Sequence, residues 1–151
     1  MRLIFLDIDG VLVTRAELIK GYIPVFNMHG FNADCVKRLN EITNTTKAKI
    51  VISSCWRHME HRKPLLEHIR LQGITGEIIG MTPNSKSGMR GEEIEDFLKE
   101  FKQPVDAFVI LDDEKTGMGE VTNFLVYIKG GIEKGGLQDE HVAEALKILN
   151  Q

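Results

Sequence analysis

Five short apolar runs set the limits on how this chain can fold. They occupy residues 3–6, 50–52, 78–79, 107–111 and 124–128. A short, continuously apolar run is typical of a strand that is buried on both faces. Strands that alternate with helices pair in parallel through right-handed crossovers, which leaves helices on both faces of the sheet. The sequence therefore predicts an α/β fold with three layers around a five-stranded parallel sheet.

The segments between the runs supply the helices. Apolar residues at helical spacing predict helices that begin after an N-cap at Asn32 and that cover residues 58–72, 91–102 and 139–149. In the second of these, Leu65, Leu66 and Ile69 are expected to face inward. Residues 13–33 lack clear periodicity and are predicted to form a loop or small flap. This leaves no room for a large cap domain, so we expect residues 1–151 to form a single domain.

The composition excludes several classes of protein. The chain is 42% apolar and 27% charged, with a formal net charge of -3, which argues against coating nucleic acid by bulk charge. No apolar stretch approaches the length of a membrane span, so no membrane association is expected. Cys35 and Cys55 form no CxxC pair, which favours reduced thiols and a cytoplasmic location. No obligate protein partner is evident.

The strongest chemical signal is Asp7-Ile8-Asp9-Gly10, directly after the first apolar run. Two carboxylates two residues apart at a strand end can point the same way, while Ile8 turns back to the core. One can attack phosphorus, and the other can protonate the leaving oxygen and later activate water. The alternative is a strand end with turn-forming Asp residues. The preceding buried strand and the apolar pair after Gly10 favour the catalytic interpretation.

Two further polar clusters follow apolar runs. Asp112 and Asp113, with Glu114 beside them, end the fourth run. Like charges ~4 Å apart cost about 4 kcal/mol at an effective dielectric of 20, and a divalent cation offsets this cost. Mg²⁺ suits such an all-oxygen site, although a solvated acidic turn is the alternative. Ser53 and Ser54 end the second run, where hydroxyl and backbone N–H groups can hold a phosphate oxygen or cap a helix.

A cation to neutralise the phosphate has two candidates. Arg90 stands at the start of the third predicted helix, and Lys86 lies in the loop before it. A basic residue at a helix start is unfavourable for the helix dipole, which favours a functional reason over an exposed surface Arg. In parallel sheets, ligands bind beyond the carboxyl ends of the strands, where all of these clusters are expected to meet.

Taken in this order, the clusters resemble those of the haloacid dehalogenase (HAD) superfamily of phosphatases, across nearly the whole chain. The resemblance implies a Rossmann-like fold in which Asp7 is the nucleophile and Asp9 the acid/base. It also implies that Ser53, with Ser54, binds phosphate and that Arg90 takes the usual Lys role. Short strings at 53–57, 82–83, 90–94 and 136–137 are most similar to the HAD domain of Swiss Army Knife RNA repair proteins.

The same resemblance implies a Mg²⁺ cofactor. Its ligands would be Asp7, the carbonyl oxygen of Asp9 and Asp113, with Asp112 in support. Other folds fit less well, because a receiver domain has its acids after different strands and a dinucleotide-binding module has a Gly-rich turn after the first. Cys55 is a poor rival nucleophile, since no His or Arg stands at the spacing of a cysteine phosphatase loop. A non-catalytic domain that binds a phosphorylated ligand remains as an alternative.

The substrate is the least constrained expectation. An open site suits a phosphorylated nucleic-acid end or a phosphoprotein, and it suits a small molecule if the flap closes over it. Residues 57–70 are rich in basic side chains that could track a phosphodiester backbone, with Trp56 to stack a base. The alternative for this segment is a solvated helix face with Trp56 in the core. The sequence therefore predicts a Mg²⁺-dependent phosphomonoester hydrolase that forms an aspartyl-phosphate. Nucleic-acid ends are its first candidate substrate.

Overall fold

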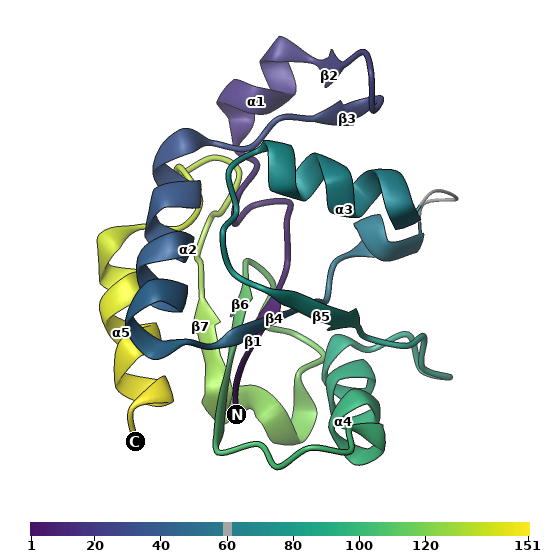
Figure 1. Cartoon of the computed structure of the whole chain (residues 1–151), viewed down its shortest axis with the longest axis vertical. Coiled ribbons are helices and arrows are strands. Elements are labelled where there is room, and N and C mark those ends of the chain that lie inside the picture. Colours follow the sequence, from purple (N-terminus) through teal and green to yellow (C-terminus); the bar gives the residue numbers. More distant parts are fainter. Residues whose placement is uncertain (59–61) are drawn as a thin grey trace.

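A computed structural model of the chain describes residues 1–58 and 62–151, with the backbone alone for residues 62 and 63. Five parallel strands form one sheet in the order β5-β4-β1-β6-β7 (Figure 1). The strands are β1 (Arg2–Leu6), β4 (Lys49–Ile52), β5 (Ile78–Met81), β6 (Ala107–Asp112) and β7 (Leu125–Tyr127). The predicted five-stranded parallel sheet is therefore confirmed.

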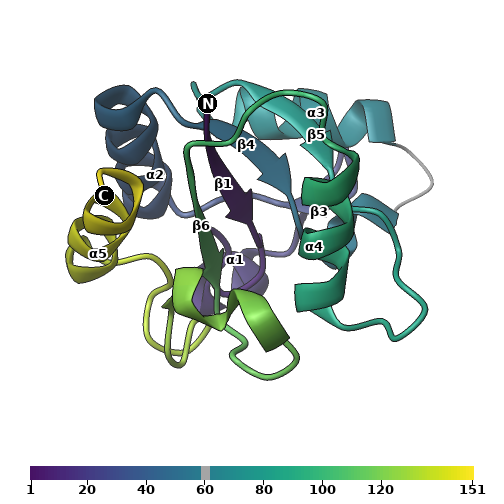
Figure 2. The same cartoon turned by 90° about the horizontal axis from the view of Figure 1, so that it is seen from below.

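Helices cover both faces of this sheet. In Figure 2, α2 and α5 stand on one side of β1, β4 and β6, and α4 stands on the other. The helices are α2 (Ala33–Thr46), α3 (Arg62–Leu71), α4 (Arg90–Glu100) and α5 (Asp139–Leu149), and two short 3₁₀ turns are η1 (Cys55–His58) and η2 (Gly119–Phe124). Within the described ranges, none of the helices combines the length and the apolar character that a membrane crossing requires.

The alternation of side chains along β1 divides the core in two. Ile4 and Leu6 pack into the larger apolar cluster with residues of α2, α3 and α5. Leu3 and Phe5 point to the other face and pack with residues of α4 and η2. All four side chains are fully buried, and burying each one contributes about 1.5–3 kcal/mol. The sheet is thus held rigidly from both sides, which fixes the positions of its strand ends.

Helix and strand boundaries follow the sequence to within two residues, apart from the helix predicted over residues 58–72. Asn32 caps α2 as predicted, because its side chain accepts the backbone N–H groups of Asp34 and Cys35. The predicted helix over 58–72 was too long, since His58 belongs to η1 and the described helix begins at Arg62; residues 59–61 lie outside the described residues. Leu66 was predicted to face inward and is 38% exposed instead. Phe124 ends η2, so the last strand begins one residue later than predicted.

The segment predicted as a loop or small flap has more structure than expected. It contains α1 (Arg15–Lys20) and an antiparallel pair of two-residue strands, β2 (Tyr22–Ile23) and β3 (Met28–His29). We call residues 14–31 the flap. In Figure 1 the flap stands at the end of the molecule opposite both termini. The backbone N–H and hydroxyl of Thr14 both donate to Glu17 Oε1, which fixes the first turn of α1.

Candidate active site

Strand register brings the predicted clusters together. Leu6 at the end of β1 is paired with Ile52 of β4 and with Leu111 of β6. Beyond these pairs, the N–H of Asp7 donates to the carbonyl of Leu111 at 3.0 Å, and the N–H of Ser53 donates to the carbonyl of Leu6 at 2.8 Å. The backbone therefore holds Asp7 between Ser53 and the acidic end of β6, at the carboxyl edge where parallel sheets bind ligands.

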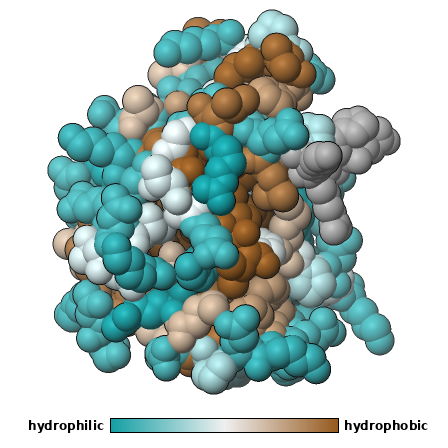
Figure 3. Space-filling view, in the orientation of Figure 1, coloured by the Kyte–Doolittle hydropathy of each residue, from teal (hydrophilic) through white to brown (hydrophobic). Residues whose placement is uncertain are grey.

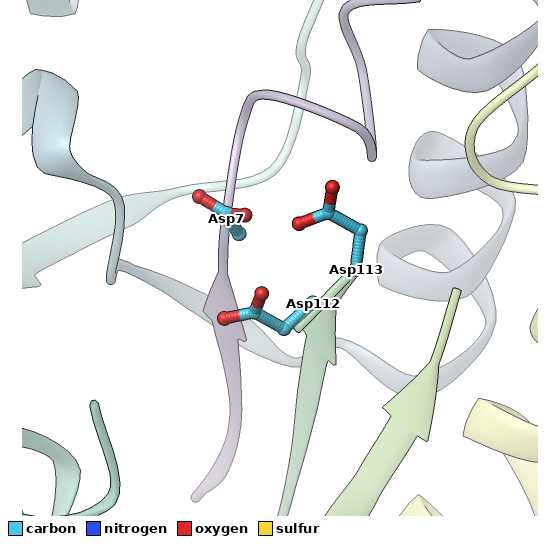
Figure 4. A group of neighbouring side chains, drawn as sticks. All are labelled: Asp7, Asp112 and Asp113. Carbon is cyan, nitrogen blue, oxygen red and sulfur yellow. The ribbon is translucent and has the colours of Figure 1, made fainter. Parts of the chain in front are cut away.

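Three carboxylates meet at this edge. Asp7, Asp112 and Asp113 each offer an oxygen, and these oxygens all lie within 4.8 Å of one another. Figure 4 shows the three side chains turned toward a common space from the ends of β1 and β6. Asp7 and Asp112 are buried, and Asp113 is half-buried. A cluster of this kind has strong self-repulsion unless protons or a cation balance it.

The pKa values of the cluster express this repulsion. Burial, together with the negative charge of Asp112, raises the pKa of Asp7 from an ordinary value of 3.8 to about 9, although the Arg90 guanidinium opposes the shift. Burial raises the pKa of Asp112 to about 6, again against the effect of Arg90. Burial also raises the pKa of Asp113. Without a cation, the site therefore retains protons at neutral pH that it would release to a bound metal.

Arg90 is the cation that the structure brings to the cluster. It is the first residue of α4, and its Nη1 donates to Asp112 Oδ2 at 2.7 Å and lies 3.6 Å from Asp7 Oδ1. Lys86, the other candidate, is exposed in the preceding loop. Asp112 Oδ1 also accepts the backbone N–H of Glu114 at 3.0 Å. Both oxygens of Asp112 are thus engaged by protein donors, which favours Asp113 as the direct metal ligand.

The two serines at the end of β4 have different surroundings. Ser53 is 1% exposed, and its hydroxyl oxygen is buried without a hydrogen-bond partner among the described residues. An orphaned hydroxyl costs about 1–3 kcal/mol, which a ligand oxygen beside Asp7 would recover. The Ser54 hydroxyl instead accepts the backbone N–H of Trp56 at 3.2 Å, so it stabilises the turn into η1. Phosphate binding by Ser53 and Ser54 stays a prediction, with Ser53 the better placed.

Two glycines allow the turn after Asp9 and the loop after β7 to pack closely against Asp113. Gly10 has a φ of 80°, a left-handed conformation that favours glycine, and a Cβ there would collide with the carboxylate of Asp113. A Cβ on Gly131 would collide with the backbone of Gly10 and lie 2.7 Å from Asp113 Cβ. The loop after β7 therefore presses the turn after Asp9 against the acidic cluster.

Trp56 holds the side chain of Asp9. Its indole N–H donates to Asp9 Oδ2 at 3.0 Å, and Trp56 itself is 5% exposed, packed against Phe31 and His68. This confirms the interpretation of Trp56 as a core residue. The indole of a buried Trp normally finds a hydrogen-bond partner, and this one orients the predicted acid/base. Asp9 stands outside the three-carboxylate cluster, and metal binding through its carbonyl oxygen stays a prediction.

Arg57 was assigned to an exposed basic surface, and this is wrong. It is 4% exposed and forms an ion pair of 2.7 Å with Glu93, which is also buried. It also donates to the carbonyls of Thr82 and Ser54 at 3.0 and 2.9 Å. The Arg57–Glu93 pair thus ties the loop after Ser53 to α4, the helix that carries Arg90. A pairing across 36 positions leaves no local pattern, so the sequence alone could not reveal it.

Elsewhere in residues 57–70, the structure also differs from the predicted basic surface. His68 is fully buried, and its Nε2 lies 2.8 Å from the carbonyl oxygen of His29. His58 and Arg70 are exposed, as predicted. His61 lies outside the described residues, as do the side chains of Arg62 and Lys63. Between residues 57 and 70, the described part therefore offers two exposed basic side chains in place of a continuous basic face.

We expect Arg57→Met to lower the free energy of unfolding by about 3–5 kcal/mol, because it leaves Glu93 buried without its partner. Urea denaturation measures this change. The double variant Arg57→Met/Glu93→Leu should recover much of the loss, since no buried charge then remains unpaired. Glu77→Gln, which breaks the exposed 2.5 Å pair with Lys49, is the matched control and should have a much smaller effect. Equal losses in both single variants would contradict a structural role for the buried pair.

The donor set fits Mg²⁺. All of the clustered ligand atoms are carboxylate oxygens, and hard divalent cations of this kind are bound by oxygen. The cluster also lies beside the orphaned hydroxyl of Ser53 and the guanidinium of Arg90, which suit a phosphate. Cys55 fits a thiolate role poorly, because burial and the charges of Asp9 and Asp7 raise its pKa.

A family model describing the HAD domain in Swiss Army Knife RNA repair proteins matches residues 3–142. The chain belongs to this family. Searches of curated proteins and of solved structures gave no match to the chain. HAD-family membership agrees with the five-stranded parallel sheet and indicates hydrolase chemistry of the HAD type. The matched range contains every residue of the candidate site, from Asp7 to Asp113.

Proposed function

We propose that this HAD domain is a Mg²⁺-dependent phosphomonoester hydrolase that forms an aspartyl-phosphate on Asp7. The observation that carries the proposal is the cluster of Asp7, Asp112 and Asp113 at one edge of the sheet, with Arg90 beside it. Three carboxylates with raised pKa values in one place are typical of a functional site. A site that binds a cation and a phosphate together explains both the clustering and the neighbouring guanidinium.

In the first half of the proposed reaction, an oxygen of Asp7 attacks phosphorus and the bond to the leaving oxygen breaks. Asp9 donates its proton to that oxygen, so an alcohol leaves. A bound Mg²⁺ would supply the positive charge that keeps Asp7 ionised next to the phosphate dianion. Arg90 and the hydroxyl of Ser53 would hold the phosphate oxygens, and Asp113 with the Asp9 carbonyl would complete the metal site together with Asp7.

In the second half, water attacks the phosphorus of the aspartyl-phosphate. Asp9, now ionised, takes a proton from that water, and phosphate and free Asp7 are released. The indole N–H of Trp56, 3.0 Å from Asp9 Oδ2, keeps the carboxyl group oriented through both halves. The two carboxylates therefore have different roles. Asp7 is the nucleophile, and Asp9, two residues later, acts first as acid and then as base.

For the substrate we propose a phosphorylated end of a nucleic acid. Membership of a family named for RNA repair supports this choice. So does a cavity of about 600 Å³, lined in part by Arg90, His58, Asn84 and Ser85, that leaves room for a large substrate beside the cluster. A small-molecule or phosphoprotein phosphatase is the second candidate, favoured by the net charge of -3 and by the burial of Arg57.

We expect kcat/KM for a short 3′-phosphorylated oligonucleotide to exceed that for the matching mononucleotide by at least about tenfold, equal to about 1.4 kcal/mol of additional binding in the transition state. Steady-state kinetics with both substrates measures this ratio. The ratio should fall only shallowly with salt, because few exposed cations are described near the site. If the extra nucleotides bring no gain, the polymer substrate must be replaced by a small phosphate ester or a phosphoprotein.

A further inference from the structure

A second cavity, of about 330 Å³, lies between the flap and the candidate site. Asp9 and Trp56 line it on the side of the sheet, and Tyr22, Met28 and His29 line it from the β2–β3 hairpin of the flap. It adjoins the larger cavity beside Arg90, since Cys55 lines both, but Asp9 lines only the smaller one. The flap thus closes one side of the site without covering the other.

The position of Asp9 decides which part of a substrate this cavity can hold. Under the proposed mechanism, Asp9 protonates the leaving oxygen, so the leaving group must lie on the side of Asp9. The cavity that Asp9 lines is therefore the space nearest to the leaving oxygen, and the larger cavity beside Arg90 is left for the rest of a longer substrate. The phosphate itself would lie against Asp7, Ser53 and Arg90, on the other side of the segment that contains Asp7 and Asp9.

The residues that line the cavity indicate which kind of leaving group it can bind. The rings of Tyr22 and His29 stand 4.5 Å apart between centroids, and Tyr22 is 58% exposed, so one face is open to a ligand. Trp56 and Met28, which are 5% and 3% exposed, add small apolar areas to the walls. No Lys or Arg belongs to the lining among the described residues, which disfavours a further phosphate or carboxylate.

Two buried imidazole nitrogens of this region lack a partner among the described residues, Nδ1 of His29 and Nδ1 of His68, whose ring packs on Trp56. A ligand with polar atoms on a flat ring would satisfy Nδ1 of His29 once that imidazole turns toward the cavity, and would stack on Tyr22 at the same time. A volume of about 330 Å³ lies at the lower end of the range for small-molecule pockets, about 300–1,000 Å³, which suits one nucleoside.

We propose that this cavity binds the nucleoside that bears the phosphate, with Tyr22 and His29 as its stacking surface. The inference rests on the proposed function only for the direction of the leaving group. It goes beyond that function by assigning the terminal nucleoside of the substrate to named residues of the flap. Stacking of this kind tolerates any base, because every base has a π-face.

Trp56 is the only tryptophan of the chain and reports directly on the cavity. Adenosine, which has no phosphate and needs no metal, is the probe. We expect adenosine to change the fluorescence of Trp56 in a saturable way, and ribose to leave it unchanged. Saturable binding of N-acetyltyrosinamide with no response to adenosine would overturn the proposal in favour of an aromatic peptide, and no response to either would overturn it outright.

Variants of the flap identify the surface. Tyr22→Ala should weaken adenosine binding at least about fivefold, because one stacking face is lost, and Tyr22→Phe should retain it because the ring remains. Val25→Ala is the matched control, since Val25 is an 85% exposed apolar residue of the same flap that lines no part of the cavity. Figure 3 shows hydrophobic surface over the flap. Equal binding by Tyr22→Ala and Val25→Ala would contradict the assignment.

Kinetics then separates this proposal from the proposed function. Tyr22→Ala should lower kcat/KM for a nucleoside monophosphate at least about fivefold and leave glycerol phosphate within about twofold. Equal losses on both esters would remove the nucleoside cavity while leaving the hydrolase in place. No turnover of either ester by the wild-type protein, with adenosine binding intact, would remove the hydrolase and leave the nucleoside site.

Discussion

Asp7→Asn is expected to abolish phosphate-ester turnover, by at least about 10³-fold in kcat, because the attacking carboxylate is lost. The fold should survive the change. The raised pKa of Asp7 shows that its negative charge is unfavourable where it stands, chiefly through burial and through the charge of Asp112. A neutral amide of the same shape removes that repulsion. The melting temperature of the metal-free variant should therefore equal or exceed that of the wild type above pH 7.

The measurement pairs initial rates on p-nitrophenyl phosphate with thermal unfolding of the same preparations. Asp139→Asn is the control, since the side chain of Asp139 is 88% exposed and pairs with Arg38 far from the cluster. It should keep wild-type activity. Wild-type turnover by Asp7→Asn would rule out the covalent mechanism. A collapsed melting temperature in Asp7→Asn would instead show that the carboxylate supports the fold.

The sheet could be predicted because its residues signal their state locally. Leu3 to Leu6 form a continuous apolar run, which requires burial on both faces wherever the strand lies. Asn32 is a strong N-cap, and it begins a helix at the position expected. The acidic strand ends could be assigned to one site because parallel strands share a carboxyl edge, a rule that needs no coordinates.

The flap escaped prediction because its elements are too short to show a period. Two strands of two residues contain no alternation, and α1 has only six residues. One signal was present. Thr14 and Glu17 stand three residues apart in the pattern of a capping box, and both donors of Thr14 bind Glu17 in the structure. The cavity beside Asp9 could not follow from sequence, since it depends on how the hairpin lies over Trp56.

The burial of Arg57 with Glu93 is the second feature that the sequence did not predict. A basic side chain after Ser53 is exposed in most proteins, and base rates alone put Arg57 at the surface. Its partner Glu93 lies on α4, so the pair exists only because the sheet brings η1 beside that helix. The same holds for the bond from Trp56 to Asp9, which joins residues 47 positions apart. Long-range polar pairing of this kind depends on tertiary structure and has no periodic trace.

Removal of divalent metal is expected to stop turnover completely, and added Mg²⁺ to restore it. A carboxylate cannot attack a phosphate dianion at close range unless positive charge lies between them. The same dependence should appear in stability. The pKa of Asp7 is about 9 in the folded chain and about 3.8 when unfolded, so the folded state binds more protons between these values. The metal-free protein should therefore lose stability as pH rises through this window.

Mg²⁺ should reverse that loss, because protons and metal compete for the same carboxylates. The increase in melting temperature on adding Mg²⁺ should accordingly be larger at pH 8 than at pH 6. Asp113→Asn should abolish most of this increase, whereas Glu120→Gln, an exposed acid on η2, should leave it unchanged. Turnover that persists in excess chelator would remove the metal from the mechanism. An increase that is independent of pH would mean that Mg²⁺ binds somewhere other than Asp7, Asp112 and Asp113.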